Sequence, residues 1–177
     1  MKNIFKKILI VISTLLILLL VLMFAMGKSY HFEKSIIINA SPEEVYQHVN
    51  SSKKFNHWNP WFDLDPNINV EYSGEDGKVG EQYCWKGNDK VGEGCHQILS
   101  LVPDQIVKTK MMFKKPFESD GYSDIIVSKD GNSSKVTWTL DCELDYPMNL
   151  MKLMMDQGMD DSYSKGLSKL KTLVEKK

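Results

Sequence analysis

An uninterrupted apolar run near the N-terminus constrains this chain more than any other feature. Residues 8–26 are nineteen consecutive residues without a charge, and Ser13 and Thr14 are the polar residues among them. A helix rises about 1.5 Å per residue, so this run would extend roughly 28 Å, close to the apolar thickness of a bilayer. We therefore predict a transmembrane helix at 8–26, preceded by a short N-terminus at 1–7 and followed by one globular domain at 27–177.

The charges that flank the run predict its orientation. Lys2, Lys6 and Lys7 precede it, and only Lys28 follows it closely. Positive charge is retained in the cytoplasm, so we expect a cytoplasmic N-terminus and a domain on the extracytoplasmic side. A weak small-x-small motif at 25–27 leaves a cleaved signal peptide as the alternative. The apolar segments of signal peptides are about 7–15 residues long, however, which favours a retained signal-anchor.

Length and charge limit what the rest of the chain can be. Residues 30–177 number 148, enough for one domain with a core and too few for two. All 23 acidic residues lie there with 18 of the 22 basic ones, so this part carries a net charge near −5. Every basic residue is a lysine. The sequence therefore shows neither the basic face that binds nucleic acid nor the guanidinium groups that clamp phosphates.

Three cysteines, Cys84, Cys95 and Cys142, are too few for a disulfide framework. Cys84 and Cys95 fall on the two arms of a predicted hairpin with the same side-chain parity, so one bridge is open if the domain lies outside the cytoplasm. Buried cysteines also behave as small apolar side chains, and this is the interpretation that we favour.

Turn signals and periodicity predict the order of the elements. The predicted helices are 41–50, with Ser41 as N-cap, then 51–57, and a long C-terminal helix at about 148–176 that breaks near Asp156–Gly158. The predicted strands are 30–40, 67–73, 80–86, 91–102, 105–113, 118–128 and 133–144. Consecutive strands joined by short turns form an antiparallel meander.

Alternation along these strands predicts one buried and one solvated face. Residues 105–113 largely alternate between inward apolar and outward basic side chains. Tyr83 and Trp85 share a face and should lie opposite Gly92 and Gly94, where large rings over glycines permit sharp curvature. The C-terminal helix is the one segment long enough to cover the apolar face, so sheet and helix would enclose a space.

Several segments resemble the SRPBCC or START-like superfamily, whose helix-grip fold is also associated with Bet v 1. The bacterial branch labelled polyketide cyclase/dehydrase and lipid transport is the most similar. The strings that carry the resemblance are SIIINASPEEVYQHV, FNHWNPWFDLDP, YSGEDGKVGEQYCWKGNDKVGEG, SKVTWTL and PMNLMKLMMDQGMDDSYSKGLSKL. The resemblance implies an α+β helix-grip domain with a cavity. Members bind lipids, sterols, polyketides or plant hormones, and a few are cyclases, but they share no catalytic motif.

Aromatic and methionine side chains are the candidates to line such a cavity, because ligand pockets are mostly apolar with a few polar groups. Methionine also adapts to variable partners. Ordinary core packing is the alternative for each of these residues. The candidate ligand-binding residues are Trp58, Trp61, Phe62, Tyr83, Trp85, His96, Met111, Trp138, Met151, Met155 and Met159, with Met154 beside them on the same helix.

Polar residues provide weaker candidates. The possible acid or base groups of an enzyme are Glu93, His96, Asp124 and Asp141. Glu93 and His96 have opposite parity on one strand, and we interpret His57 as a surface or capping residue. Asp63-Leu-Asp65-Pro-Asn67 begins like a calcium loop but lacks its glycine and its final glutamate, so turn chemistry explains it better.

Two functions from different classes are compatible with this sequence. The first is a membrane-anchored, noncatalytic module that binds a lipid-like or other apolar small molecule between sheet and helix. The alternative is a cyclase or dehydrase acting on a polyketide-like substrate, which would need a titratable group inside the cavity. We predict no cofactor, no metal and no nucleic acid partner, and no protein partner can be named.

Overall fold

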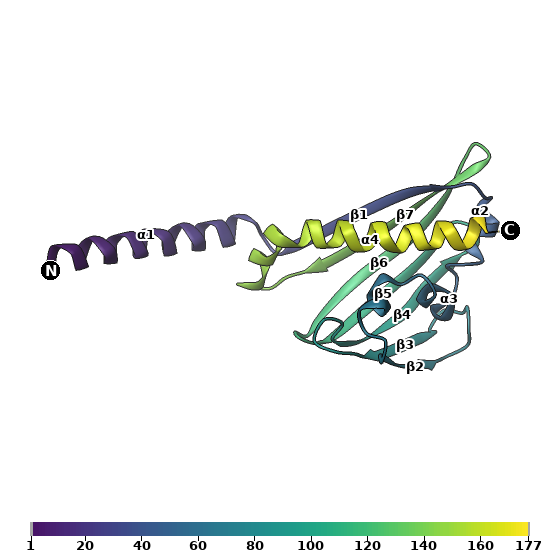
Figure 1. The fold of residues 1–177 in the computed structure, drawn as a ribbon, viewed down its shortest axis with the longest axis horizontal. Coiled ribbons are helices and arrows are strands. Elements are labelled where there is room, and N and C mark those ends of the chain that lie inside the picture. Colours follow the sequence, from purple (N-terminus) through teal and green to yellow (C-terminus); the bar gives the residue numbers. More distant parts are fainter. Residues whose placement is uncertain (1, 177) are drawn as a thin grey trace.

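The computed structural model describes residues 2–176. The helix α1 (Lys2–Ala25) projects away from a domain that consists of one curved sheet and the long helix α4 (Lys152–Glu175) (Figure 1). Residues Asn3–Ala25 of α1 are long and apolar enough to cross a membrane, and only 6% of the most apolar part is buried by the rest of the protein. The predicted apolar helix is therefore present and largely free of the domain.

The sheet has seven strands in the order β1-β7-β6-β5-β4-β3-β2, and every neighbouring pair is antiparallel. This arrangement confirms the predicted α+β helix-grip fold. The strands are β1 (Ser29–Ile38), β2 (Asn69–Ser73), β3 (Gln82–Lys86), β4 (Glu93–Val102), β5 (Ile106–Lys115), β6 (Ser119–Asp130) and β7 (Ser133–Glu143).

Short helices between β1 and β2 cover part of the sheet. They are α2 (Pro42–Tyr46), α3 (Ser52–Asn56) and the 3-10 turn η1 (Pro60–Leu64). The predicted capping box is formed, because the Ser41 side chain accepts from Glu44 N and the Glu44 carboxylate accepts from Ser41 N. The helix α2 contacts β6 and β7, and α3 contacts β4.

The helix α4 crosses the concave side of the sheet beside β1 and buries Tyr163, Leu167 and Leu170 (Figure 1). The predicted break near Asp156–Gly158 is wrong, since α4 is continuous through all 24 residues. A glycine costs a helix about 1 kcal/mol relative to alanine. Bonds to β1 on both sides of this point offset that cost: Tyr30 Oη donates to Asp156 at 2.9 Å, and Lys34 Nζ donates to Asp160 at 2.5 Å.

The β3–β4 hairpin corrects two further expectations. Cys84 and Cys95 lie directly opposite each other with Cα atoms 4.0 Å apart and form a disulfide, so our preference for three unpaired cysteines is wrong. Trp85 faces Gly94 as predicted, but Tyr83 faces His96 and not Gly92. A Cβ at Gly94 would lie 2.7 Å from both Met112 O and the Trp85 ring, which explains why glycine is needed there.

The end of α1 is bonded to the segment that leads into α4. The 3-10 turn η2 (Met148–Met151) carries Asn149, which is fully buried and donates to Met23 O at 2.6 Å and Gly27 O at 2.9 Å. Lys152 donates to Gly27 O at 3.0 Å and Ser29 O at 2.5 Å. The carbonyl groups at a helix C-terminus lack partners within the helix, and here a side-chain amide and a cation supply them.

Candidate functional site

A cavity of about 320 Å³ lies between the concave face of the sheet and α4. Its interior is lined mainly by aromatic rings from α3, η1, three strands and α4. These are Phe55, Trp61, Phe62, Tyr83, Trp85, Phe113, Trp138 and Tyr163. The strands contribute them because alternate residues point to one face, so the same parity that makes the sheet amphipathic supplies the lining.

Hydrogen bonds fix two of the central rings. Trp138 and Tyr163 stack with centroids 4.0 Å apart and planes at 22°. Trp138 Nε1 donates to Ser123 Oγ at 2.9 Å, and Ser123 Oγ donates to Thr139 O at 2.7 Å. Tyr163 Oη donates to the same carbonyl at 3.3 Å. The polar atoms of both rings are thus satisfied by the sheet, and their faces and edges form an apolar wall.

His96 lines the cavity and has a buried hydrogen-bonding atom that is unused. Its ring stacks on Phe55 with centroids 5.2 Å apart and lies 5.0 Å from Tyr83. Its Nδ1 is buried and has no partner among residues 2–176. Burial lowers the pKa of His96 from 6.5 to about 4, because an apolar surrounding disfavours the charged ring. His96 is therefore neutral at physiological pH and can offer one donor and one acceptor.

Most of the sequence-predicted site residues meet at this cavity. Those that line it are Trp61, Phe62, Tyr83, Trp85, His96, Met111, Trp138, Met155 and Met159. Trp58 is instead fully buried behind the lining, in contact with Phe55 and Trp138, and its Nε1 donates to His48 O. Met151 lines a wider depression outside the cavity, and Met154 is 84% exposed.

The acid and base candidates lie elsewhere, except for His96. Glu93 pairs with Lys115 at 3.3 Å. The other two are engaged on the outer face, Asp124 with Lys108 at 3.3 Å and Asp141 with His31 at 2.6 Å. His57 is exposed and forms the C-cap of α3. The arrangement therefore brings no pair of catalytic groups together inside the cavity.

The segment that begins like a calcium loop is explained by turn chemistry. Asp65 accepts from Asn67 N at 2.9 Å and from Asn88 N at 2.6 Å, so it joins η1 to the β3–β4 turn. Over the described part of the chain, no group of three or more His, Cys, Asp or Glu side chains could hold a metal ion.

Sequence reasoning missed several lining residues. Asn59 caps η1 and donates to Tyr83 Oη at 3.5 Å, and Ser123 holds Trp138. The inward parity of Ser123 on its strand could have identified it, as could the position of Tyr163 in the apolar stripe of α4. Neither strand parity nor a helical stripe could have identified the turn residues at the opening of the cavity.

The opening of the cavity lies at one end of the sheet. Four lining residues are exposed, and all are in or next to the β3–β4 and β5–β6 turns: Asp89, Lys90, Lys115 and Pro116. We call these four residues the mouth. Outside it lies an open depression of about 830 Å³, which shares Pro116, Leu144 and Met155 with the cavity.

Comparison with known proteins agrees with this architecture. Residues 29–175 match the model of the family described as polyketide cyclase / dehydrase and lipid transport. The chain belongs to this family. The SRPBCC resemblance inferred from sequence is thereby confirmed, and the family match covers every strand of the sheet and α4. The search of curated proteins found no match.

Solved structures share the fold of this family domain at low sequence identity. A truncated norcoclaurine synthase from Thalictrum flavum has a TM-score of 0.68 and 12% identity, covering 85% of this chain and 97% of that chain. Protein CV1439 from Chromobacterium violaceum has a TM-score of 0.60 and 15% identity, covering 83% and 98%. The Aha1 dimer structure from Colwellia psychrerythraea has a TM-score of 0.57 and 18% identity, covering 83% and 97%.

Proposed function

We propose that this protein is a membrane-anchored binding module that holds one compact, apolar small molecule in the cavity between the sheet and α4. The observation that carries the proposal is the cavity of about 320 Å³ with its wall of aromatic rings. Burying apolar area yields about 25 cal/mol per Å², so a ligand that fills this space is bound mainly by desolvation. Membership in a family that includes lipid transport agrees with this interpretation.

Cavity size and polarity narrow the class of ligand. A volume near 320 Å³ is at the lower end of the range for ligand pockets, about 300–1,000 Å³. It suits a fused-ring or single-chain compound better than a complete two-chain lipid. Neutral His96 would orient a hydroxyl or carbonyl group of such a ligand. A carboxylate is disfavoured in the aromatic interior, because the lysines that line the cavity, Lys90 and Lys115, lie at its mouth.

Two observations support an extracytoplasmic domain on a membrane anchor. The exposed apolar helix α1 follows three lysines, which favours a cytoplasmic N-terminus. The Cys84–Cys95 disulfide is typical of an oxidising compartment. Anchoring would raise the concentration of the binding site near the bilayer, where apolar ligands partition.

The cyclase or dehydrase alternative is less well supported. It needs a general base or acid next to the ligand, and His96 is the interior candidate. With a pKa near 4 the ring is a weak base at neutral pH and is unprotonated, so it is a poor proton donor as well.

Fluorescence titration of the full chain in phosphatidylcholine nanodiscs tests the proposed function. The probe is the uncharged compound N-phenyl-1-naphthylamine, excited by energy transfer from the cavity residues Trp61, Trp85 and Trp138. We expect saturable emission above that of empty nanodiscs. The cavity-filling variant Met159→Trp should bind at least about tenfold more weakly, because an added ring occupies space that the ligand needs.

Leu173→Trp is the matched control, since it adds the same ring to α4 at a position outside the cavity. It should bind the probe like the wild type. Equal binding by both tryptophan variants, or a wild-type signal no greater than that of empty nanodiscs, would refute the proposed site.

A further inference from the structure

The contacts at the end of α1 determine which part of the domain faces the membrane. Asn149 and Lys152 bond carbonyl groups of residues 23–29, and the Phe24 and Tyr146 rings lie 5.0 Å apart. Met23 is 8% exposed, unlike the rest of α1. Several bonds of this kind between two rigid segments restrict rotation of the domain about α1. The end of the sheet nearest α1 is thereby held against the bilayer that α1 would cross.

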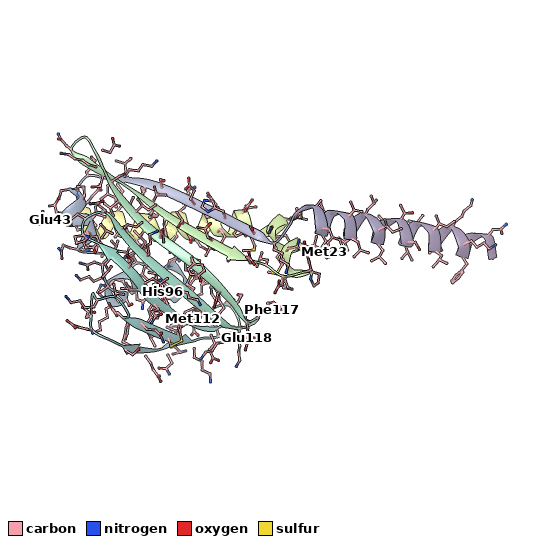
Figure 2. All side chains as sticks on the ribbon, turned by 180° about the vertical axis from the view of Figure 1, so that it is seen from behind. Met23, Glu43, His96, Met112, Phe117 and Glu118 are labelled. Carbon is pink, nitrogen blue, oxygen red and sulfur yellow. A yellow bond between two sulfur atoms is a disulfide. The ribbon has the colours of Figure 1, made fainter. Side chains whose placement is uncertain are left out.

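The mouth is at this same end. Leu144 lines the cavity, and its N–H donates to Lys28 O at 3.0 Å, three residues beyond the end of α1. Ser29 and Tyr30 line the depression outside the mouth. Figure 2 shows Phe117, in the β5–β6 turn next to the mouth, on the side of the domain toward α1. The cavity therefore opens toward the membrane and not toward the far end of the domain.

Large exposed apolar side chains lie at the same end of the domain as this opening, in the β5–β6 turn and between β7 and the first turn of α4. These side chains are Phe117 (55% exposed), Tyr146 (39%), Met151 (45%), Leu153 (65%) and Met154 (84%). We call this group of five residues the apolar rim. Four of the five lie between the end of β7 and the first turn of α4, in the segment that also carries the contacts with α1 from Asn149 and Lys152. Exposed apolar patches of this kind mark protein or membrane contacts.

We infer that the apolar rim docks on the bilayer that holds α1 and that ligand passes between the lipid phase and the cavity through the mouth. This inference deepens the proposed function and rests on it for the role of the cavity. The occupant of the rim is a lipid surface, because the rim is continuous with the exposed apolar surface of α1 and the bonds from Asn149 and Lys152 keep it there.

The charges around the opening indicate which lipid surface fits. The depression carries Glu118, Asp120, Asp141, Glu143 and Asp145. Three of these are paired: Asp120 with Lys110, Asp141 with His31, and Asp145 with Lys28. At the mouth Asp89 and Lys90 offset each other and Lys115 pairs with Glu93, so the balance of the lining residues stays negative. Electrostatic attraction to anionic lipids therefore does not drive docking. Docking is instead driven by insertion of apolar side chains into zwitterionic lipid, and this insertion should be insensitive to salt.

Photo-crosslinking of the full chain in phosphatidylcholine nanodiscs tests the docking. The photoreactive residue p-benzoylphenylalanine is placed at position 117, at position 153, or at control position 79. Val79 is also apolar and 63% exposed, but it lies in the β2–β3 turn at the opposite end of β3 from the mouth. We expect lipid adducts by mass spectrometry at 117 and 153, at least about tenfold above position 79, unchanged in high salt. Equal yields at all three positions, or none at 117 and 153, would overturn the inference.

Ligand loading tests the route separately from the site. Phe117→Asp places a carboxylate in the rim, and Val79→Asp makes the same change at the far end. With N-phenyl-1-naphthylamine supplied in the nanodisc lipid, Phe117→Asp should slow loading about tenfold, because a charge resists transfer into lipid, and leave the equilibrium affinity unchanged. Val79→Asp should load at the wild-type rate. Unchanged loading in Phe117→Asp contradicts the route, whereas absence of probe binding in the wild type contradicts the proposed function and leaves the crosslinking result standing.

Discussion

At the scale of single residues, His96 determines the character of the cavity more than any other side chain. It is enclosed by Phe55 and Tyr83, its Nδ1 has no partner within the described residues, and burial keeps it neutral. A histidine in such a place contributes a single uncharged hydrogen-bonding group to an otherwise apolar wall. The same burial makes the stability of the domain sensitive to acid.

His96 predicts a loss of stability at low pH. Between the unfolded pKa of about 6.5 and the folded pKa of about 4, the unfolded chain binds a proton that the folded chain does not. Stability therefore rises with pH in this window, and lowering the pH from 7.5 to 5 should cost about 2 kcal/mol through this residue. His96→Phe should remove that part of the pH dependence in urea unfolding of the full chain. An identical pH dependence in the variant would contradict the assignment.

Sequence alone predicted the strand residues of the site better than those outside regular structure. Parity assigned Tyr83, Trp85 and Trp138 to the inner face, because alternation along a strand is strict. It could not separate Trp58, which is core, from Trp61, which lines the cavity, since both lie in or near the irregular chain around η1. The prediction that Met151 lines the cavity is wrong for a related reason. Met151 lies in η2, where the helical period of α4 does not apply.

At the scale of elements, the β3–β4 hairpin supplies two walls of the cavity and carries the disulfide on its other face. Side-chain parity and hairpin register were predictable from the sequence, and they allowed a Cys84–Cys95 disulfide. Whether the two cysteines pair depends on the 4.0 Å distance between their Cα atoms, which only the folded hairpin fixes. For α4, the propensity of Gly158 predicted a break, but the bonds to β1 outweighed a cost of about 1 kcal/mol.

Removing the disulfide should destabilise the domain measurably. The bridge closes a loop with a sequence separation of 11, for which chain entropy predicts about 3 kcal/mol. Cys84→Ser with Cys95→Ser should lower the urea midpoint accordingly, whereas Cys142→Ser, at the free cysteine, should leave the bridge intact. Detection of three reactive thiols in the unreduced, denatured wild type would show that the bridge is absent.

At the scale of the whole molecule, the curved sheet is covered by one long helix, and the cavity between them opens on the side of the domain that carries α1. Sequence patterns predicted the sheet, the covering helix and the apolar N-terminal helix, because each is encoded by a local pattern of apolar residues. They did not predict the direction of the mouth. That direction depends on Asn149 bonding Met23 O, 126 residues away in the chain, and no local pattern reports such a contact.

Methionine methyl NMR of the full chain in nanodiscs most directly tests the central claim that the interior accepts an apolar ligand. Met111, Met155 and Met159 line the cavity, whereas Met112 lies on the outer face beside the disulfide (Figure 2). Adding N-phenyl-1-naphthylamine should shift the methyl signals of the first three, saturably and together, and leave that of Met112 in place. Unshifted signals from the three cavity methionines, or equal shifts for all four, would show that the cavity does not bind the probe and would contradict the account.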